Sequence, residues 1–467
     1  MKTSMQNCRA GVRVVWPVLA AVLALLSAPA AHAQQKFTDW GWPLPYERVS
    51  DKSVQWLKSK GWWPIQVAYQ APWSGQNTIN IVMDRQGLMK ERGVEAAWQA
   101  FPSGPAINET IVSAKFQVGN GGNFPFTSLL DKSIPVTAIA ILSPNLLHAL
   151  VVPPDSPLKS IKDLKGGKEP AVIGIVTGSS AEFYFQMAMQ MNGLVSGKDV
   201  VLKNMPPGEQ MALPKGIAGV VPWDPTPTMM VDERKNGRII DSIFPYNMYE
   251  GQFYVRSELV QNTPDVVQAF CDAYAEATLW IRRNPDKAAE LMAQDPSLKS
   301  FSKEILLQQI QAYNNLYKPT YIYPHAAFWG SVNETIFKWL YEQKRITRPL
   351  VAKDFTDAVD ARFMDKTFAK LGWAVPRQPP FIPADWKGDP AKPPYPDYMQ
   401  AINTRTPQPF PERGERSQQI DRLPGSAERG FTHRSSDNPV TVYRSCPRMS
   451  MPDSGRRAPE TAAASGC

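Results

Sequence analysis

The residues best suited to binding a solute form the run Thr177-Gly178-Ser179-Ser180. This run follows residues 171–176, a short apolar and β-branched stretch that is typical of a buried strand. Ser179 or Ser180 can cap a helix that begins at this point. The free N–H groups and the positive dipole end of such a helix can hold an anion or a carbonyl oxygen. The alternative is that the serines only cap the helix, because serine is common at that position.

The other candidate residues follow predicted strands elsewhere in the chain, where ligands of parallel sheets bind. Glycine lets backbone N–H groups approach a ligand, and tryptophan offers a flat apolar face with one N–H donor. Asp224 can contact a polar ligand or cap a helix at Thr226, and both roles stay open. His148 lies at the end of an apolar strand, and we predict that it is a core residue. The predicted ligand contacts are Gln70, Trp73, Gly121, Gly122, Asn123, Phe124, Asn145, Thr177, Gly178, Ser179, Ser180, Trp223, Asp224 and Tyr246.

Residues for catalysis or metal binding are sparse. The four histidines are scattered, and no G-x-S-x-G turn presents a nucleophilic serine. A metal site needs clustered His, Cys or acidic ligands. Of the four cysteines, only Cys271 lies in the body of the chain, on a predicted helix, where we expect a small core residue. We therefore predict that the protein is not an enzyme and has no metal and no cofactor.

The first 33 residues have the pattern of a secretory signal peptide. Lys2, Arg9 and Arg13 give a positive start, residues 14–26 are mostly apolar, and residues 31–33 (AHA) form a cleavage site. The apolar run is too short to span a membrane, and no later stretch is long and apolar enough. We predict an exported, periplasmic and soluble protein.

The formal net charge of +8 is unevenly distributed. Residues 1–33 carry three positive charges, and residues 412–467 carry nine Arg and seven acidic residues, which leaves +3 for residues 34–411. A body this close to neutral gives no reason to expect a nucleic-acid partner. Residues 412–467 have few apolar side chains, so we predict a disordered tail whose deletion leaves folding and binding unchanged.

Apolar runs and helical periodicity alternate along the body, which predicts an α/β fold with a largely parallel sheet. Val136–Leu142 is a predicted strand, Pro264–Arg283 a predicted amphipathic helix, and residues 119–125 a predicted Gly-rich loop. An aromatic-rich arm, residues 34–63, precedes the body and is expected to pack on it. A Pro-rich extension, residues 346–411, follows and is expected to pack through its aromatic side chains.

Four short stretches stand in a specific order along the body. They are residues 156–166 (SPLKSIKDLKG), 178–181 (GSSA), 220–225 (VVPWDP) and 262–267 (NTPDVV). In order and spacing they resemble segments of the periplasmic solute-binding proteins of ABC importers, of the nitrate/sulfonate/taurine type. The resemblance covers about residues 64–343, and the ordered set behind a signal peptide is its specific feature.

The resemblance implies the two-lobed periplasmic-binding-protein fold, an α/β fold with two parallel-rich sheets, two hinge crossings and a ligand cleft between the lobes. Lobe 1 would comprise residues 64–152 and 251–345, and lobe 2 residues 153–250. The crossings would lie near residues 148–154 and 246–253.

The same resemblance implies a monomeric protein that captures a small organic anion or a flat heterocycle and delivers it to a membrane permease. The absence of an arginine at a motif position disfavours a small, fully charged anion. Two other roles stay open: a ligand-sensing domain for a signalling receptor, and an enzyme of the same fold. Two kinds of enzyme share the fold that the resemblance implies, a desulfinase and a pyrimidine-precursor synthase, and both need cysteines that Cys271 does not match in position.

Overall fold

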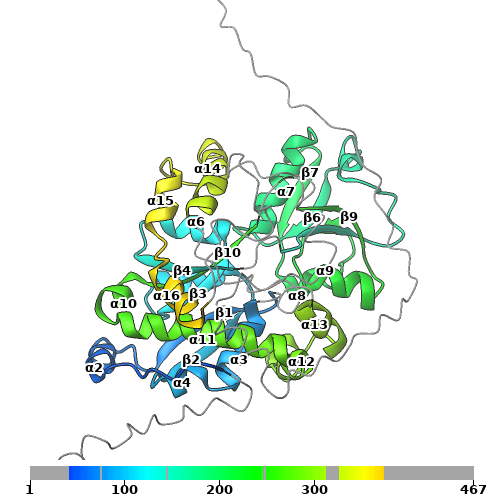
Figure 1. The fold of residues 1–467 in the computed structure, drawn as a ribbon. Helices are drawn as coiled ribbons and strands as arrows, with labels where there is room; N and C mark the ends of the chain where they lie inside the picture. The colour runs from blue at the N-terminus through cyan, green and yellow to red at the C-terminus, as the bar shows by residue number, and fades with distance from the viewer. Residues whose placement is uncertain are drawn as a thin grey trace, which may run out of the picture. The chain divides into compact units, whose positions relative to one another are not determined.

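The computed structural model describes residues 42–73, 76–142, 146–243, 246, 249–311 and 326–372. The predicted signal peptide, the predicted tail and most of the Pro-rich extension lie outside these residues. The described strands form two five-stranded sheets, and Figure 1 labels most of these strands.

The first sheet has the strand order β2-β1-β3-β10-β4. β1 runs parallel to β2 and β3, whereas β10 runs antiparallel to β3 and β4, so the sheet is mixed. β4 has the predicted bounds, because its sequence, apolar except for Thr137, suits a buried strand. The strands are β1 (Ile65–Gln70), β2 (Ala96–Phe101), β3 (Val118–Gly122), β4 (Val136–Leu142) and β10 (Gly251–Arg256). The helices around this sheet are α3 (Gln76–Arg85), α4 (Leu88–Glu91), α5 (Gly104–Val112), α6 (Asn123–Asp131), α10 (Ser257–Asn262), α11 (Pro264–Arg283), α12 (Pro285–Ala293) and α13 (Lys303–Ile310).

The second sheet has the order β7-β6-β8-β5-β9 and is also mixed. Its strands are β5 (Ala149–Val152), β6 (Ala171–Ile175), β7 (Val200–Asn204), β8 (Gly219–Val220) and β9 (Arg238–Ser242). Its helices are η1 (Ile161–Leu164), α7 (Ser180–Met191), α8 (Pro207–Gln210), α9 (Thr226–Thr228) and the π-helical turn η2 (Met229–Glu233).

The chain passes between the sheets at residues 143–148 and 243–250. The predicted lobe boundary at residue 152 is therefore misplaced, because β5 pairs with β8 and β9 of the second sheet. A four-residue apolar strand carries no pattern that indicates which sheet it joins, and only its partners decide this.

Residues 119–125 are not the predicted loop but the end of β3 and the start of α6. Glycine usually weakens a strand, and this misled the prediction. Here close neighbours require it: an ideal Cβ on Gly119 would lie 2.9 Å from the Tyr254 ring, and one on Gly122 would lie 2.6 Å from Ser180 Oγ.

The helices agree with the periodicity over most of the body. α11 has the predicted bounds and carries Cys271 in the core, where the thiol is fully buried. Residues 77–92, which the periodicity predicts as one helix, form α3 and α4 instead. The break falls at Gly87, whose φ of 64° lies in the left-handed region.

The aromatic arm packs on α11. Trp42 is buried, and the arm also contains α2 (Asp51–Ser59), which Ser50 caps. Asp265 of α11 accepts hydrogen bonds from Ser50 N (2.7 Å) and Ser53 Oγ (2.5 Å).

The Pro-rich extension contains two helices that the sequence analysis does not predict, α15 (Ala352–Asp357) and α16 (Arg362–Leu371). They form in a stretch of the extension that is free of proline. Phe355, Phe363 and Phe368 are buried, as expected of aromatic anchors, and α16 contacts α11. α14 (Ala326–Glu342) precedes them and contacts α15.

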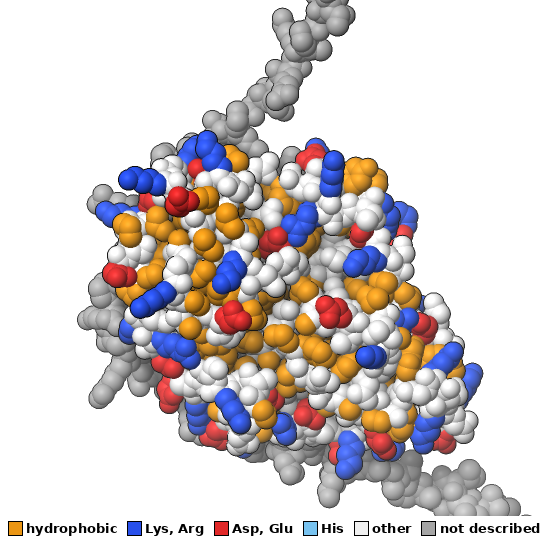
Figure 2. All heavy atoms as spheres, turned by 180° about the vertical axis from the view of Figure 1, so that it is seen from behind, with side chains coloured by type: hydrophobic (Ala, Val, Ile, Leu, Met, Phe, Trp, Pro, Cys, Tyr) orange, Lys and Arg blue, Asp and Glu red, His pale blue; other side chains and the backbone are white. Residues whose placement is uncertain are grey.

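The surface carries charges of both signs. On the face shown in Figure 2, basic and acidic side chains alternate with hydrophobic ones, and neither sign forms a continuous patch. Within the described ranges, no helix is both long and apolar enough to cross a lipid bilayer.

Candidate ligand-binding pocket

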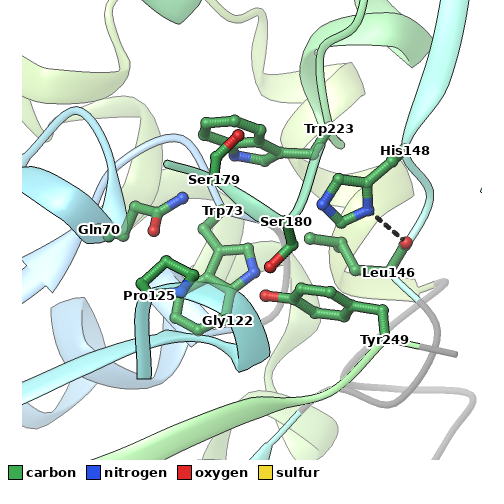
Figure 3. Close-up of a pocket in the computed structure, with 11 residues that line it drawn as sticks. Gln70, Trp73, Gly122, Pro125, Leu146, His148, Ser179, Ser180, Trp223 and Tyr249 are labelled. Carbon is green, nitrogen blue, oxygen red and sulfur yellow. Dashed lines mark hydrogen bonds between the residues drawn. The ribbon is translucent and has the colours of Figure 1, made fainter. Parts of the chain in front are cut away.

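A small cavity lies where the ends of β1 and β3 meet the start of α7 and the loop after β8 (Figure 3). Its volume is about 20 Å³, which is room for roughly one water molecule. A sulfonate or an aromatic ring can therefore enter only if the elements of the two sheets move apart. The lining residues are Gln70, Trp73, Gly104, Gly122, Pro125, Leu146, His148, Ser179, Ser180, Trp223 and Tyr249.

Two hydrogen bonds between the sheets hold the cavity closed. Ser180 Oγ, at the start of α7, donates to Asn123 Oδ1 at the start of α6 over 2.8 Å. Trp223 Nε1, after β8, donates to the Pro72 carbonyl oxygen, after β1, over 2.7 Å. Both bonds must break when the sheets separate to admit a solute.

The hydroxyl protons of both serines are used within the protein. Ser179 is the N-cap of α7: its Oγ accepts from Glu182 N at 3.4 Å and donates to the Val176 carbonyl at 2.6 Å. The prediction of a serine-capped helix start is confirmed. In this structure the Ser180 hydroxyl donates to Asn123 Oδ1, and its contact with a ligand stays a prediction.

His148 lines the cavity rather than only filling the core. Its side chain is buried, and its Nδ1 lies 2.9 Å from the Leu146 carbonyl oxygen. Burial lowers the pKa of His148 to about 4, against the opposing effect of that hydrogen bond. The imidazole is therefore uncharged at neutral pH.

Aromatic rings form the apolar wall of the cavity. Trp73 and Tyr249 meet edge to face with ring centroids 6.5 Å apart. The His148 ring lies 4.8 Å from the Tyr249 ring and 6.2 Å from the Trp223 ring. Burial, with the neighbouring Glu250, raises the pKa of the Tyr249 hydroxyl well above its usual range, so it stays protonated.

Within the part of the chain that the structure describes, no Lys, Arg, Asp or Glu lines the cavity. One buried acid, Glu250, lies behind the cavity wall, where its carboxylate accepts from Asn123 Nδ2 at 3.3 Å. Burial raises the pKa of Glu250 to about 8, and amide donors, including Asn333 and Gln252, oppose the shift. At neutral pH the surroundings of the cavity are therefore largely uncharged.

The structure brings together six of the predicted contacts in the cavity lining: Gln70, Trp73, Gly122, Ser179, Ser180 and Trp223. It places seven others outside the lining: Gly121, Asn123, Phe124, Thr177, Gly178, Asp224 and Tyr246. Asn145 lies outside the described residues. That the six residues in the cavity contact a ligand stays a prediction.

Several of the predicted contacts outside the lining have local roles instead. Asp224 accepts from Thr228 Oγ1 at 2.6 Å. The N-cap of α9 is Pro225, and no described side chain bonds to that cap, so the helix-capping alternative does not describe Asp224. The Tyr246 hydroxyl, in the second crossing segment, donates to Asp241 Oδ2 of β9 at 3.1 Å. Gly178, with a φ of 79°, donates its N–H to a carboxylate oxygen of Glu182 at 2.7 Å.

A second group of contacts joins α7 to the end of α14, outside the cavity. Arg345 Nη1 and Nη2 donate to the two carboxylate oxygens of Glu182, each over 2.9 Å. The same guanidinium lies 5.7 Å from the Phe124 ring. Trp339 Nε1 donates to Gln190 Oε1 over 2.7 Å. These contacts hold α7 against elements that follow the first sheet in the chain.

The predicted contact set omitted five lining residues: Gly104, Pro125, Leu146, His148 and Tyr249. The last three lie in the two segments that pass between the sheets. Such segments necessarily border any cavity between the sheets, so the predicted crossings were a usable signal for them. Among the described residues, no group of three or more His, Cys, Asp or Glu side chains is arranged to hold a metal ion.

Comparison with known proteins shows which family and which relatives this chain resembles. Residues 76–288 match the family model described as NMT1/THI5 like. A relative from Bacillus subtilis (strain 168), whose name describes aliphatic sulfonate binding, is 23% identical over 235 residues. That match covers 50% of this chain and 69% of the relative.

Solved structures agree on the fold. The alkanesulfonate-binding protein from Xanthomonas axonopodis pv. citri, bound to MOPS, is 17% identical with a TM-score of 0.54, over 63% of this chain and 97% of that chain. The periplasmic nitrate-binding protein from Synechocystis PCC 6803 is 14% identical with a TM-score of 0.54, over 66% of this chain and 88% of that chain. The chain therefore contains an NMT1/THI5-like domain, and its fold is that of the periplasmic binding proteins.

Proposed function

We propose that this chain is the exported solute-binding component of an ABC importer. It captures one small organic solute, an anion or a flat heterocycle, and delivers it to a membrane permease. One observation carries the proposal: elements of both sheets line a single cavity, which the bonds Ser180–Asn123 and Trp223–Pro72 close. A cavity of this kind opens and closes as the sheets move, which couples its occupancy to a shape that a permease can recognise.

The comparisons and the cavity wall support this role over catalysis. The relatives described above are named for binding sulfonates or nitrate. The rings of Trp73, Trp223 and Tyr249 favour a solute with a planar or apolar part.

Native mass spectrometry of the chain purified from its host tests the proposal. We expect one small molecule per chain, released unchanged in mass by denaturation. Added back at a hundredfold excess over its Kd, this solute should stabilise the chain by about 2.7 kcal/mol through mass action. Small-angle scattering should show a smaller radius of gyration with solute than without it.

Three results would count against the proposal in different ways. A chain that retains no solute, and that no sulfonate, carboxylate or heterocycle in a panel stabilises, would contradict solute binding. A solute that leaves the protein chemically changed would indicate an enzyme. Unchanged uptake of the recovered solute by cells that lack the chain would favour the sensing role.

A further inference from the structure

His148 is an uncharged hydrogen-bond acceptor. A neighbouring backbone carbonyl decides which of its two ring nitrogens carries the proton. Its Nδ1 lies 2.9 Å from the Leu146 carbonyl oxygen, and a carbonyl can only accept. Nδ1 therefore carries the ring proton, and Nε2 carries a lone pair. Because burial lowers the pKa of His148 to about 4, the ring does not gain a second proton at neutral pH.

The lone pair of Nε2 accepts no hydrogen bond from the described residues. Figure 3 shows this second ring nitrogen turned to the interior of the cavity, away from Leu146. Among the described residues, the only hydrogen bond of the His148 ring is the one at Nδ1, and none is made at Nε2. The His148 side chain is only 2% exposed, so it has little contact with bulk water.

Trp73 offers a hydrogen-bond donor, its Nε1–H group, in the same cavity. Its ring is 1% exposed, and its Nε1–H lies near the Tyr249 hydroxyl, on which it acts to lower the pKa, but it makes no well-aligned hydrogen bond with the described residues. Figure 3 shows this nitrogen on the side of the cavity where the Ser180 and Tyr249 hydroxyls lie. A donor and an acceptor that make no well-aligned hydrogen bond in an enclosed cavity are costly unless a ligand or a water in the cavity meets them.

His148 remains a hydrogen-bond acceptor at Nε2 when the cavity opens. The bond between His148 and Leu146 lies within a three-residue segment, so separation of the sheets does not break it. In contrast, Ser180 and Trp223 donate across the sheets and are released on opening. Ser180 can then donate or accept, whereas His148 can only accept.

We propose that His148 is a specificity-determining residue, which accepts a hydrogen bond from the solute through Nε2. The proposal rests on the solute-binding function and narrows it. The solute is planar and uncharged and carries an N–H or O–H donor for His148 beside an acceptor for Trp73, as an aromatic amide, lactam or sulfonamide does. A fully ionised sulfonate offers only acceptors, so its oxygen would face the lone pair of His148, with no cationic side chain among the described lining residues to compensate.

The first test needs no solute. Nitrogen-15 NMR of the histidine-labelled chain at neutral pH should show one neutral ring with its proton on Nδ1. That signal should be absent from the His148→Gln variant, which assigns it. An imidazolium, or a proton on Nε2, would overturn the inference even in a chain that binds a solute.

The second test compares two probes of the same size, benzenesulfonamide and benzenesulfonate, by calorimetry. We expect the neutral sulfonamide to bind at least tenfold more tightly to the natural chain. In His148→Phe the preference should disappear, and in His148→Gln, whose amide can accept or donate, it should shrink. Melting curves without a probe check that both variants fold.

Tighter binding of benzenesulfonate, or a preference that survives in His148→Phe, would overturn the inference. If neither probe binds, the solute recovered from the host decides instead, since a solute without any N–H or O–H group would also overturn it. A chain that binds no solute at all contradicts the proposed function, while the NMR result still decides the polarity of His148.

Discussion

Glu250 has no exposed surface and lies where the second crossing segment enters β10. Asn333 Nδ2 and Gln252 Nε2 donate to its Oε1 over 2.7 and 3.0 Å, and Asn123 Nδ2 donates to Oε2 over 3.3 Å. Burial nevertheless outweighs these donors and raises the pKa of Glu250 from 4.5 to about 8. Asn123 in turn accepts from Ser180, so this carboxyl supports one of the two bonds that close the cavity.

This raised pKa makes stability depend on pH in a defined window. Below pH 4.5 the carboxyl is protonated in both states, and between 4.5 and about 8 it ionises only in the unfolded chain. Glu250 therefore lowers the free energy of unfolding as pH rises through this window, by at most roughly 1.4 kcal/mol per pH unit. Glu250→Gln should remove this loss, so urea unfolding at several pH values should show the variant gaining stability relative to the natural chain as pH rises.

The matched control for Glu250→Gln is Glu290→Gln, which changes an exposed carboxylate paired with Lys303. Lys303 lowers the pKa of Glu290, so ionisation of Glu290 affects stability at pH values below the range in which Glu250 acts. Parallel stability curves for the natural chain and Glu250→Gln would contradict the prediction.

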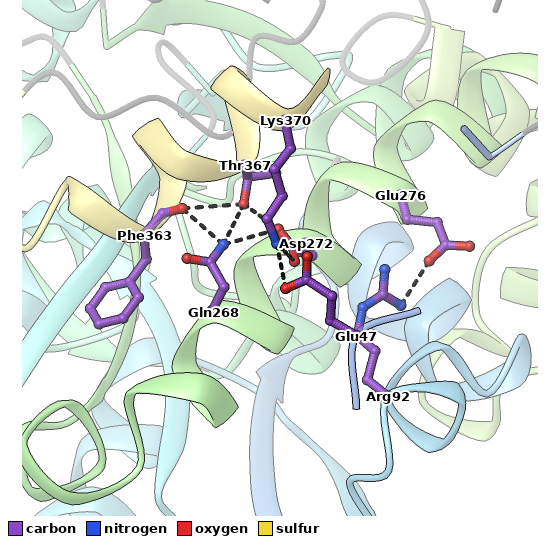
Figure 4. A network of polar contacts seen from close by, with 8 residues as sticks. All are labelled: Glu47, Arg92, Gln268, Asp272, Glu276, Phe363, Thr367 and Lys370. Atoms are coloured by element: carbon purple, nitrogen blue, oxygen red, sulfur yellow. Dashed lines mark hydrogen bonds and ion pairs between the residues drawn. The ribbon is translucent and has the colours of Figure 1, made fainter. Parts of the chain in front are cut away.

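At the scale of elements, α11 holds the segments that lie outside the family match. Figure 4 shows Lys370 of α16 between Asp272 of α11 and Glu47 of the arm, at 3.0 and 2.9 Å. Beside them Thr367 Oγ1 donates to Asp272 Oδ1 over 2.6 Å. The arm and α16 therefore share partners on one helix.

The deepest contact of this group is the ion pair Arg92–Glu276. Arg92 Nη1 lies 2.8 Å from Glu276 Oε2, and both side chains are almost fully buried. Burial raises the pKa of Glu276, and Arg92 is the main influence that opposes it. Tyr46 of the arm donates to Glu276 Oε1 over 2.7 Å, and the Arg92 guanidinium lies 5.0 Å from the Tyr46 ring. The arm thus covers a pair that water would otherwise reach.

We expect Arg92→Met to lower the free energy of unfolding by about 3–5 kcal/mol, because it leaves a buried carboxyl without its counter-charge. Arg362→Met removes an exposed pair with Asp360 and should change stability little. Denaturant unfolding of both variants checks this. Equal losses in the two variants would show that burial of the pair is not what matters.

At the scale of the whole molecule, closure depends on how near α7 can come to the end of β3. An ideal Cβ on Gly122 would lie 2.6 Å from Ser180 Oγ and 2.8 Å from the Tyr249 ring. The backbone of Gly122 has a φ of −73°, which any residue adopts. A methyl group at this position therefore blocks the approach of the sheets without straining β3.

Gly122→Ala should fold but bind its solute more weakly, and small-angle scattering should show less compaction on adding solute than in the natural chain. Gly208→Ala is the control, because a Cβ there has no neighbour within 4 Å. Normal compaction and affinity in Gly122→Ala would mean that the bound state does not bring these elements together.

Local sequence patterns were enough to predict the elements whose burial follows from the spacing of their own apolar side chains. β4 and α11 have the predicted bounds because a run that is apolar except for Thr137, and an apolar stripe with a period of 3.6 residues, each indicate which side chains are buried. Ser179 caps α7 as predicted, since the cap bond closes within four residues. The ordered motifs were likewise sufficient for the fold class.

Only the tertiary structure decided which hydrogen-bond donors of the candidate site are already used within the protein, and how large the cavity is. Ser180 and Asn123 are 57 residues apart, and Trp223 and Pro72 are 151 apart, so no local pattern shows that these donors are already used. The glycines of β3 look like a loop until the side chains of Tyr254, Tyr249 and Ser180 fill the space beside them. Hydrogen-bond partners and steric neighbours are properties of the packed chain, because groups distant in sequence compete for the same space and the same proton.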